Sequence, residues 1–482
     1  MSTFLICYAH IVIANKTKPC YKKLMDSSPL IFIKSQIFPS EGLRHRKGGF
    51  VGVISALLLM AFFLCVIGSC GKSDYEPNPE TYRIPNGTKP CEHPEYWPFS
   101  MASNKHPFLV HYRTLEEAET AEKVIEYLDN AWEFEVNVLG FTPPPSDEGR
   151  CGPDGLFDVF IWRGNRSCFV DIISEQIVTP WGGRTSFMLL DPWGPYGGAI
   201  LDQTIGHEFN HACHAADDWH EAGDAFEMTA TYIEQYFGDA CTYCISDFQA
   251  NPDWGLLWYD DYKTWYMYGA ALYLYFLRDY YFPAEEGFPA RLWRNVRNIP
   301  DPFVNKPNFV EGLDALLVPL GSSFMDSAIL FARWRYFTGS RDDGGHFKRW
   351  PLEKKQLPFI AEADVKLHAS ILFANTVYNV DPPPMLLGSA YIEILQDQPG
   401  RNSFEVSLLT AANPDLRWVM QAVPGTVAGS DGDTIDLSAG SARVSFTTEG
   451  KRTLIITLMP AKAFDLDKQS GETFPVAIRL AP

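Results

Sequence analysis

The chain has 482 residues, of which 46% are hydrophobic and 21% are charged, and its formal net charge is -19. This length predicts two or three domains, and the composition excludes a disordered or collagen-like chain. Residues 1–70 hold 8 basic and 2 acidic side chains, so residues 71–482 carry a net charge of -25. Such an acidic body argues against nucleic acid as a partner and against electrostatic attachment to a membrane surface.

The first 70 residues have the order of an export signal. Three basic side chains at positions 44, 46 and 47 precede an apolar run of 18 residues at 50–67, and small residues follow. The run ends in IGSC, which resembles a bacterial lipobox with Cys70 as the lipid-bearing residue. A cleaved signal and an uncleaved signal anchor both stay open at this length, as does an ordinary buried Cys70. We expect an exported chain, either a membrane-anchored lipoprotein at the cell envelope or a secreted protein.

A proline-rich polar stretch at residues 71–105 follows, with EPNPE, PNGTKP and EHPEYWP. It predicts a linker that leads away from the membrane, with the folded part beginning near Pro107. Six cysteines lie beyond residue 70, and an even number is consistent with disulfides whose pairing the sequence leaves open. Cys241 and Cys244 form a single CxxC without zinc-ribbon or thioredoxin-like context, so we interpret it as structural.

Residues 106–380 are predicted to form a catalytic unit whose first half is a small α/β fold. Phe108 begins a short apolar strand, and Thr114 with Glu117 forms a capping box for a helix that reaches about Val138. Further strands are predicted at residues 157–162 and 186–190.

The second half of this unit, from about residue 199 to residue 337, has a mostly helical pattern, with an aromatic-rich helix at 268–281 and another at 323–337. The proline run at 381–384 marks a boundary, and short alternating segments follow it. The predicted fold class is therefore α+β, in which a C-terminal β-sandwich at residues 381–482 follows the catalytic unit. Its expected strands lie at 390–395, 403–409, 416–423, 442–447, 453–459 and 474–480.

The segment most informative about chemistry is an HExxH motif at residues 207–211. Residues four apart share one face of a helix, so His207 and His211 can bind one Zn²⁺. Glu208 lies one step round the helix, where its carboxylate can deprotonate a metal-activated water. The motif therefore predicts a catalytic zinc centre; the alternative is that both histidines are surface residues of an amphipathic helix.

The third zinc ligand has two candidates. Glu227 lies in a following segment of helical pattern, whereas Asp217 has the spacing of a metzincin-type site. The second arrangement needs a sharp turn at position 214, which normally calls for glycine. Because position 214 is a histidine, a continuous helix is favoured, and it carries Asp217 away from the metal. The sequence therefore favours Glu227.

Several nearby residues have both a functional and an ordinary interpretation. Tyr266 and Tyr268 can donate a hydrogen bond to a developing oxyanion, although most aromatic residues of such a helix belong to the core. His214 and His220 can act as further ligands, but packed or solvated helix positions are the commoner roles. Glu234 shares a helix face with Glu227, so it is a candidate to support the ligands from behind.

Four segments together resemble the myxobacterial-type secreted metalloproteases, a gluzincin-like family: HEFNHACHA, EMTATYIE, YMYGAALYLYFLRDYY and FMDSAILFARWRYFTGSR. The likeness extends upstream to FLVHY, AWEFEVNVLGF and FDVFIW and downstream to LLGSAYIEIL, so it covers most of residues 105–480. The resemblance implies a zinc peptidase that is a lipoprotein or secreted. His207 and His211 match its histidine ligands, Glu208 its general base and Glu227 its glutamate ligand. Asn210 and Cys213 depart from the pattern, since bulky apolar or aromatic residues are common there.

The sequence therefore predicts an exported zinc metalloendopeptidase that hydrolyses protein or peptide substrates. It predicts a membrane association through a lipid or a signal anchor. The alternative from another class is a cell-surface binding or adhesion lipoprotein, in which the peptidase-like unit is a catalytically silent scaffold. Zinc content and hydrolysis of unfolded protein separate the two interpretations.

Overall fold

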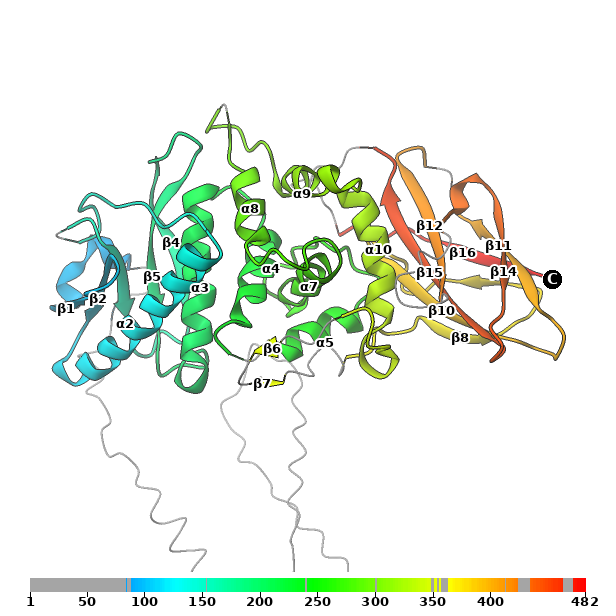
Figure 1. Ribbon diagram of the computed structural model, residues 1–482, viewed down its shortest axis with the longest axis horizontal. Coiled ribbons are helices and arrows are strands. Elements are labelled where there is room, and N and C mark those ends of the chain that lie inside the picture. The colour runs from blue at the N-terminus through cyan, green and yellow to red at the C-terminus, as the bar shows by residue number, and fades with distance from the viewer. Residues whose placement is uncertain are drawn as a thin grey trace, which may run out of the picture. The chain divides into compact units, whose positions relative to one another are not determined.

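The computed structural model describes residues 84, 88–152, 154–238, 241–299, 301–347, 351–352, 355–356, 363–411, 413–423, 434–462 and 471–482. Residues 77–482 belong to one compact unit (Figure 1). The unit mixes helices with several sheets, as the predicted α+β class requires. The predicted signal segment and Cys70 lie outside the described residues.

The first sheet has five strands in the order β1-β2-β3-β5-β4. The central strands β2, β3 and β5 are parallel, while β1 and β4 are antiparallel edge strands. The three central strands are buried along their whole length, and most of their side chains are apolar, which favours a core sheet covered on both faces. The strand bounds are Phe99–Ala102 (β1), Phe108–Tyr112 (β2), Phe157–Ile161 (β3), Phe169–Ile177 (β4) and Arg184–Leu190 (β5).

The folded part begins earlier than the sequence predicted, so the linker assignment is wrong for residues 88–105. Strand β1 pairs with β2, and a disulfide joins Cys91 to Cys151. Trp97 is 3% exposed, and its indole Nε1 donates a 2.8 Å hydrogen bond to the carbonyl oxygen of Ile161. The proline-rich composition concealed this segment, because its order comes from contacts with residues far along the chain.

We expect Trp97→Ala to lower the free energy of unfolding by about 3–5 kcal/mol, the usual cost of removing a buried tryptophan side chain. The substitution removes edge-on contacts with Phe160 and Trp162, at ring-centroid distances of 5.1 and 5.8 Å, and the hydrogen bond to Ile161. Urea denaturation measures the change. Trp193→Ala is the matched control, because Trp193 is 41% exposed, and an equal loss in both variants would contradict the expectation.

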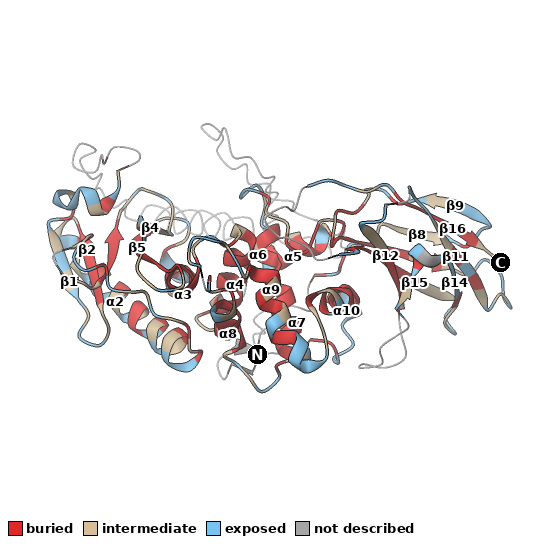
Figure 2. Cartoon of the chain, turned by 90° about the horizontal axis from the view of Figure 1, so that it is seen from above, coloured by how far each residue is buried: buried red, intermediate tan, exposed pale blue. Residues whose placement is uncertain are grey.

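Helices follow the sheet and pack on it. Helix α3 packs against α2, β5 and α4 (Figure 1), and Figure 2 shows α3, α4 and α7 as mostly buried. One hydrophobic core joins the first sheet to these helices. The α-helix bounds are Ala118–Trp132 (α2, continued by a π-helical segment Glu133–Val138), Leu201–Asp217 (α3), Gly223–Glu234 (α4), Thr242–Ala250 (α5), Tyr266–Gly269 (α6), Ala271–Tyr280 (α7), Phe288–Asn295 (α8), Phe309–Leu317 (α9) and Phe324–Tyr336 (α10).

Side-chain caps lie at the starts of two helical segments, and the predicted capping box is one of them. Thr114 and Glu117 form the reciprocal capping box, which opens a 3₁₀ turn at Leu115–Glu117 ahead of α2. Ser323 caps α10, because its side chain accepts a hydrogen bond from the backbone N–H of Asp326. These local bonds satisfy amide groups that the first turn of a helix leaves without partners.

Two further sheets contain all six strands predicted after residue 381, in the orders β13-β12-β15-β10-β8 and β14-β11-β16-β9. They share a core in which Ile392 and Ile456 of one sheet join Val406 and Ile478 of the other. Tyr391 connects this part to α10, since its hydroxyl donates a 2.6 Å hydrogen bond to the carbonyl oxygen of Ala332. The strands are Ala369–Leu372 (β8), Thr376–Asn379 (β9), Ser389–Leu395 (β10), Ser403–Leu409 (β11), Leu416–Val423 (β12), Ile435–Asp436 (β13), Ser441–Ser445 (β14), Lys451–Pro460 (β15) and Ala477–Ala481 (β16); a separate pair is Pro351–Leu352 (β6) and Lys355–Gln356 (β7).

The predicted boundary at residue 381 is too late. Strands β8 and β9 precede it, yet β8 pairs in parallel with β10 and β9 pairs antiparallel with β16. Both strands have only four residues and contain no buried side chain, so they lack the long apolar alternation that identifies a strand in sequence. The proline run therefore lies within this part of the chain.

Among the described residues, no single helix has the length and apolarity needed to cross a membrane. Segments Phe309–Leu320 and Phe324–Tyr336 meet those criteria only as a pair, and the pair is bent by 87°.

Candidate metal centre

The candidate centre lies between helices α3 and α4. The HExxH motif occupies the middle of α3, and Glu227 lies on α4. Gly206, immediately before His207, lets the Phe237 ring pack directly against α3. A Cβ at position 206 would lie 2.2 Å from this ring. The candidate ligands are therefore held on two regular helices whose residues are mostly buried, which fixes their positions.

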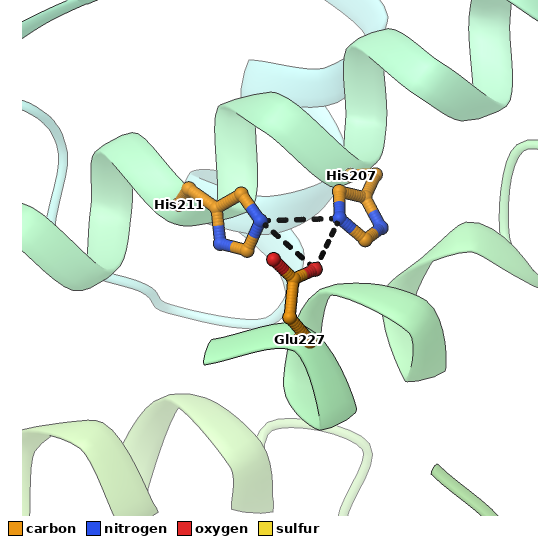
Figure 3. Close-up of side chains that lie close together, drawn as sticks. All are labelled: His207, His211 and Glu227. Atoms are coloured by element: carbon orange, nitrogen blue, oxygen red, sulfur yellow. Dashed lines mark hydrogen bonds and ion pairs between the residues drawn. The ribbon is translucent and has the colours of Figure 1, made fainter. Parts of the chain in front are cut away.

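Three potential ligand atoms converge at this point (Figure 3). Nε2 of His207 lies 3.1 Å from Nε2 of His211 and 3.1 Å from Oε2 of Glu227. Nε2 of His211 lies 3.5 Å from the same Glu227 oxygen. Figure 3 shows the two imidazoles descending from one helix toward the carboxylate that rises from the next. The structure thus brings together the three residues predicted as ligands.

These distances fit a tetrahedral metal. Zinc binds histidine nitrogen and carboxylate oxygen at about 2.0–2.2 Å, so neighbouring ligand atoms of a tetrahedral site lie about 3.3–3.6 Å apart. The three edges of 3.1, 3.1 and 3.5 Å are close to that spacing. The residues can therefore hold a metal ion with little rearrangement, and three protein ligands leave one position for water or substrate.

Glu234 supports His207 from behind. Glu234 lies two helical turns after Glu227 on α4. Its Oε1 lies 2.7 Å from Nδ1 of His207. A carboxylate in this position holds the proton on Nδ1 and leaves Nε2 free to bind a metal. The seven-residue spacing from Glu227 predicted this supporting role, and the structure places Glu234 accordingly.

Electrostatics around the ligands favour an ionised Glu227. Burial acts to raise the pKa of Glu227, but the neighbouring His211 and His207 outweigh it and lower the pKa to about 2. For Glu208, burial raises the pKa, and the imidazoles of His207 and His211 only partly oppose this effect. The two carboxylates therefore differ in basicity, as a ligand and a general base require.

A cavity of about 760 Å³ adjoins the three ligands. Glu208 lines it, and so does Tyr268, whose ring stacks against His207 at a centroid distance of 6.1 Å. Burial first, and then the charge of Glu227, raise the pKa of Tyr268 far above its ordinary value, so the hydroxyl stays protonated. Tyr268 is thus placed to donate a hydrogen bond in this cavity, as predicted.

The structure does not bring Tyr266 to the cavity. It is fully buried, and its hydroxyl lies 2.9 Å and 3.1 Å from the carbonyl oxygens of Trp254 and Gly255. Residues two positions apart on a helix point to nearly opposite faces. Only one of Tyr266 and Tyr268 can therefore face the candidate ligands. The prediction of a catalytic Tyr266 therefore gives way to a core role.

Tyr262 lines the cavity although the sequence analysis did not identify it. It follows Asp261 in a turn where both residues have positive φ, 58° and 56° in chain order. Non-glycine residues in this conformation cost about 1 kcal/mol or more, and such strain is concentrated at functional sites. Partial burial and then the charge of Glu227 raise the pKa of Tyr262. Only the turn could have signalled this residue, because it belongs to no motif.

If the centre is the hydrolytic one that the sequence predicts, Tyr268→Phe should lower kcat by about 10- to 100-fold with little change in KM, because a hydroxyl that donates to developing charge stabilises the transition state more than the bound substrate. Steady-state kinetics on a peptide substrate measure both constants. The matched control is Tyr266→Phe, which should lower stability through the lost core hydrogen bond and leave kcat unchanged. The reverse pattern of kcat effects would contradict the assignment.

The remaining candidates do not belong to the group of converging ligand atoms, although the ring of His214 lies 5.7 Å from that of His211. Helix α3 continues through His214, as predicted, and His214 stacks on Trp293 at a ring-centroid distance of 3.7 Å. Burial lowers the pKa of His214 well below its usual value, so it is a neutral core side chain. Asp217 Oδ1 accepts hydrogen bonds of 2.7 Å from both Thr142 and Arg297. The side chain of His220 is 42% exposed and outside the cavity lining.

The two departures from the family pattern have a structural role. Asn210 donates a 2.8 Å hydrogen bond from Nδ2 to Oε2 of Glu135, which is fully buried in the π-helical segment. Burial raises the pKa of Glu135 well above its usual range, and Asn210 opposes this effect. A polar residue at 210 thus gives one hydrogen bond to a buried acid, while Cys213 is a free, fully buried thiol in the main core.

No known family model matches the chain, and no curated protein shows a significant match to its sequence. The interpretation of the centre therefore rests on its own geometry.

Proposed function

We propose that the chain is a zinc metallopeptidase, and the observation that supports this most is the HExxH helix facing Glu227 across the 3.1–3.5 Å ligand triangle. Zinc supplies Lewis acidity and activates water when bound. His207, His211 and Glu227 hold it, and Glu234 orients His207. Glu208 accepts a proton from the attacking water and returns it to the leaving amine. Tyr268 donates a hydrogen bond to the oxygen of the attacked carbonyl.

The shape of the cavity favours an extended polypeptide as substrate. Phe169 and Val170 line it, and both belong to β4, an edge strand of the first sheet that pairs with β5 on one side only among the described residues. An edge strand offers unpaired backbone N–H and C=O groups to a peptide that lies beside it. Backbone pairing of this kind holds the chain across Glu208 without demanding one sequence.

We further propose that the chain is exported. Its catalytic unit would be gluzincin-like and followed by a β-sandwich. Cys91–Cys151 and Cys241–Cys244 are disulfides, which persist in oxidising compartments outside the cytosol. The shared core of the two C-terminal sheets supports the sandwich. The apolar run and Cys70 support a lipid or signal anchor.

A zinc assay paired with a casein digest tests the function. We expect about one zinc per chain, and cleavage of unfolded casein that stops with a chelator and returns when zinc is added. Glu208→Gln serves as the inactive control. A folded, zinc-free chain that leaves casein intact would instead support the binding or adhesion protein.

A further inference from the structure

Three aromatic side chains form a continuous wall from the mouth of the cavity to the metal ligands. We call Tyr243, Trp265 and Tyr268 the aromatic wall. The rings of Tyr243 and Trp265 are 5.0 Å apart and meet edge to face, and those of Trp265 and Tyr268 are 5.3 Å apart. Tyr243 is 54% exposed and Trp265 is 37% exposed, so this wall opens to solvent at one end and reaches His207 at the other.

The charged side chains that line the cavity are acidic. Four carboxylates line it: Glu208, Glu221, Glu227 and Glu234. No lysine or arginine is found among the lining residues that the structure describes. Four carboxyl groups with no basic side chain among the described lining residues make the cavity acidic, which favours a cationic group over an anionic one.

Glu234 lies beside the aromatic wall as well as behind His207. Glu234 lines the same cavity as Tyr243, Trp265 and Tyr268. The Glu234 side chain is 20% exposed, so part of it faces solvent. The cavity thus presents aromatic faces and a partly exposed carboxylate to a bound ligand.

We propose that the aromatic wall and Glu234 form a subsite for a lysine or arginine side chain of the polypeptide substrate. This inference rests on the proposed function, because it names the substrate class of the same site. The methylene stem of such a side chain packs on the rings, while its cationic end lies over an aromatic face and near the carboxylate. An uncharged side chain fills the same space without neutralising the carboxylates, and an acidic one is repelled.

A disulfide constrains the backbone that carries Tyr243, the outermost residue of the aromatic wall. Tyr243 lies between the two bridged cysteines Cys241 and Cys244, at the start of α5, and both cysteines line the cavity. A fixed aromatic side chain loses little conformational entropy when a ligand binds. The CxxC motif, structural in the sequence interpretation, therefore also holds part of the substrate subsite.

Binding of labelled peptides to zinc-loaded Glu208→Gln protein tests the proposal, because this variant leaves the peptide intact. The peptides are eight-residue Gly/Ala chains that differ only in one central residue: lysine, norleucine, phenylalanine or glutamate. We expect fluorescence anisotropy to show about tenfold tighter binding of the lysine peptide than of the norleucine peptide. Adding Trp265→Leu should remove most of this difference. Adding Trp193→Leu, a similarly exposed tryptophan outside the cavity lining, should leave it unchanged.

Equal or tighter binding of the norleucine or phenylalanine peptide would overturn the subsite, and so would no binding of any peptide. A separate measurement of casein cleavage by the wild-type protein keeps the two proposals apart. Casein cleavage without a lysine or arginine preference contradicts the subsite alone. Selective binding of the lysine peptide by a protein that cleaves nothing supports the subsite and contradicts the peptidase.

Discussion

Replacing Glu208 with glutamine is expected to lower kcat by about 10²- to 10⁴-fold while the protein keeps its zinc. Glu208 lines the cavity beside the ligands, but it is not one of the three residues whose atoms form the ligand triangle. The amide has the size of the carboxylate and cannot accept the proton of the attacking water. Zinc content by elemental analysis and casein turnover on the same sample give the two readouts.

The comparison depends on the variant being folded. Glu208 is 7% exposed, so removal of its charge relieves a desolvation cost and should not destabilise the helix. Thermal unfolding of the zinc-loaded variant serves as the control. Full turnover by a folded, zinc-loaded Glu208→Gln protein would exclude Glu208 as the general base and require another proton acceptor in the cavity.

The candidate metal centre was predictable because its parts follow local rules. The four-residue spacing of His207 and His211 depends only on helix geometry, and the absence of glycine at position 214 implied that α3 continues. The spacing of apolar residues around Glu227 predicted a second helix, which is α4. In the same way, alternating runs at 403–409 and 416–423 match β11 and β12 to the residue. Periodicity identifies such elements wherever one face is buried.

The rest depends on contacts between distant residues, which periodicity does not contain. None of the four residues of strand β1 is buried, and its order comes from pairing with β2 and from a disulfide that spans 60 positions. Tyr262 reaches the cavity through a strained turn that no sequence pattern marks. The partners of Asp217 and Asn210 lie 80 and 75 positions away, at Arg297 and Glu135. Sequence could say that Asp217 leaves the metal, but not what it binds.

Substitution of the third candidate ligand, Glu227, is expected to have a large effect on zinc affinity. We expect Glu227→Ala to weaken zinc binding by more than about 100-fold, because loss of an outer-shell partner alone costs 10- to 100-fold and Glu227 contributes a ligand atom. Asp217→Asn should keep its zinc. Asp217 binds Thr142 and Arg297, so its substitution weakens a buried ion pair and lowers stability instead.

Competition with a chromophoric chelator measures zinc affinity for both variants, and thermal unfolding separates loss of metal from loss of fold. The informative pattern is a zinc-deficient Glu227→Ala protein that still unfolds cooperatively, beside an Asp217→Asn protein that retains zinc and unfolds at a lower temperature. Loss of zinc from Asp217→Asn together with full retention by Glu227→Ala would reverse the ligand assignment. In that case α3 would have to break near His214 when metal binds, against the continuous helix that runs through Ala212, Ala215 and Ala216 to Asp217.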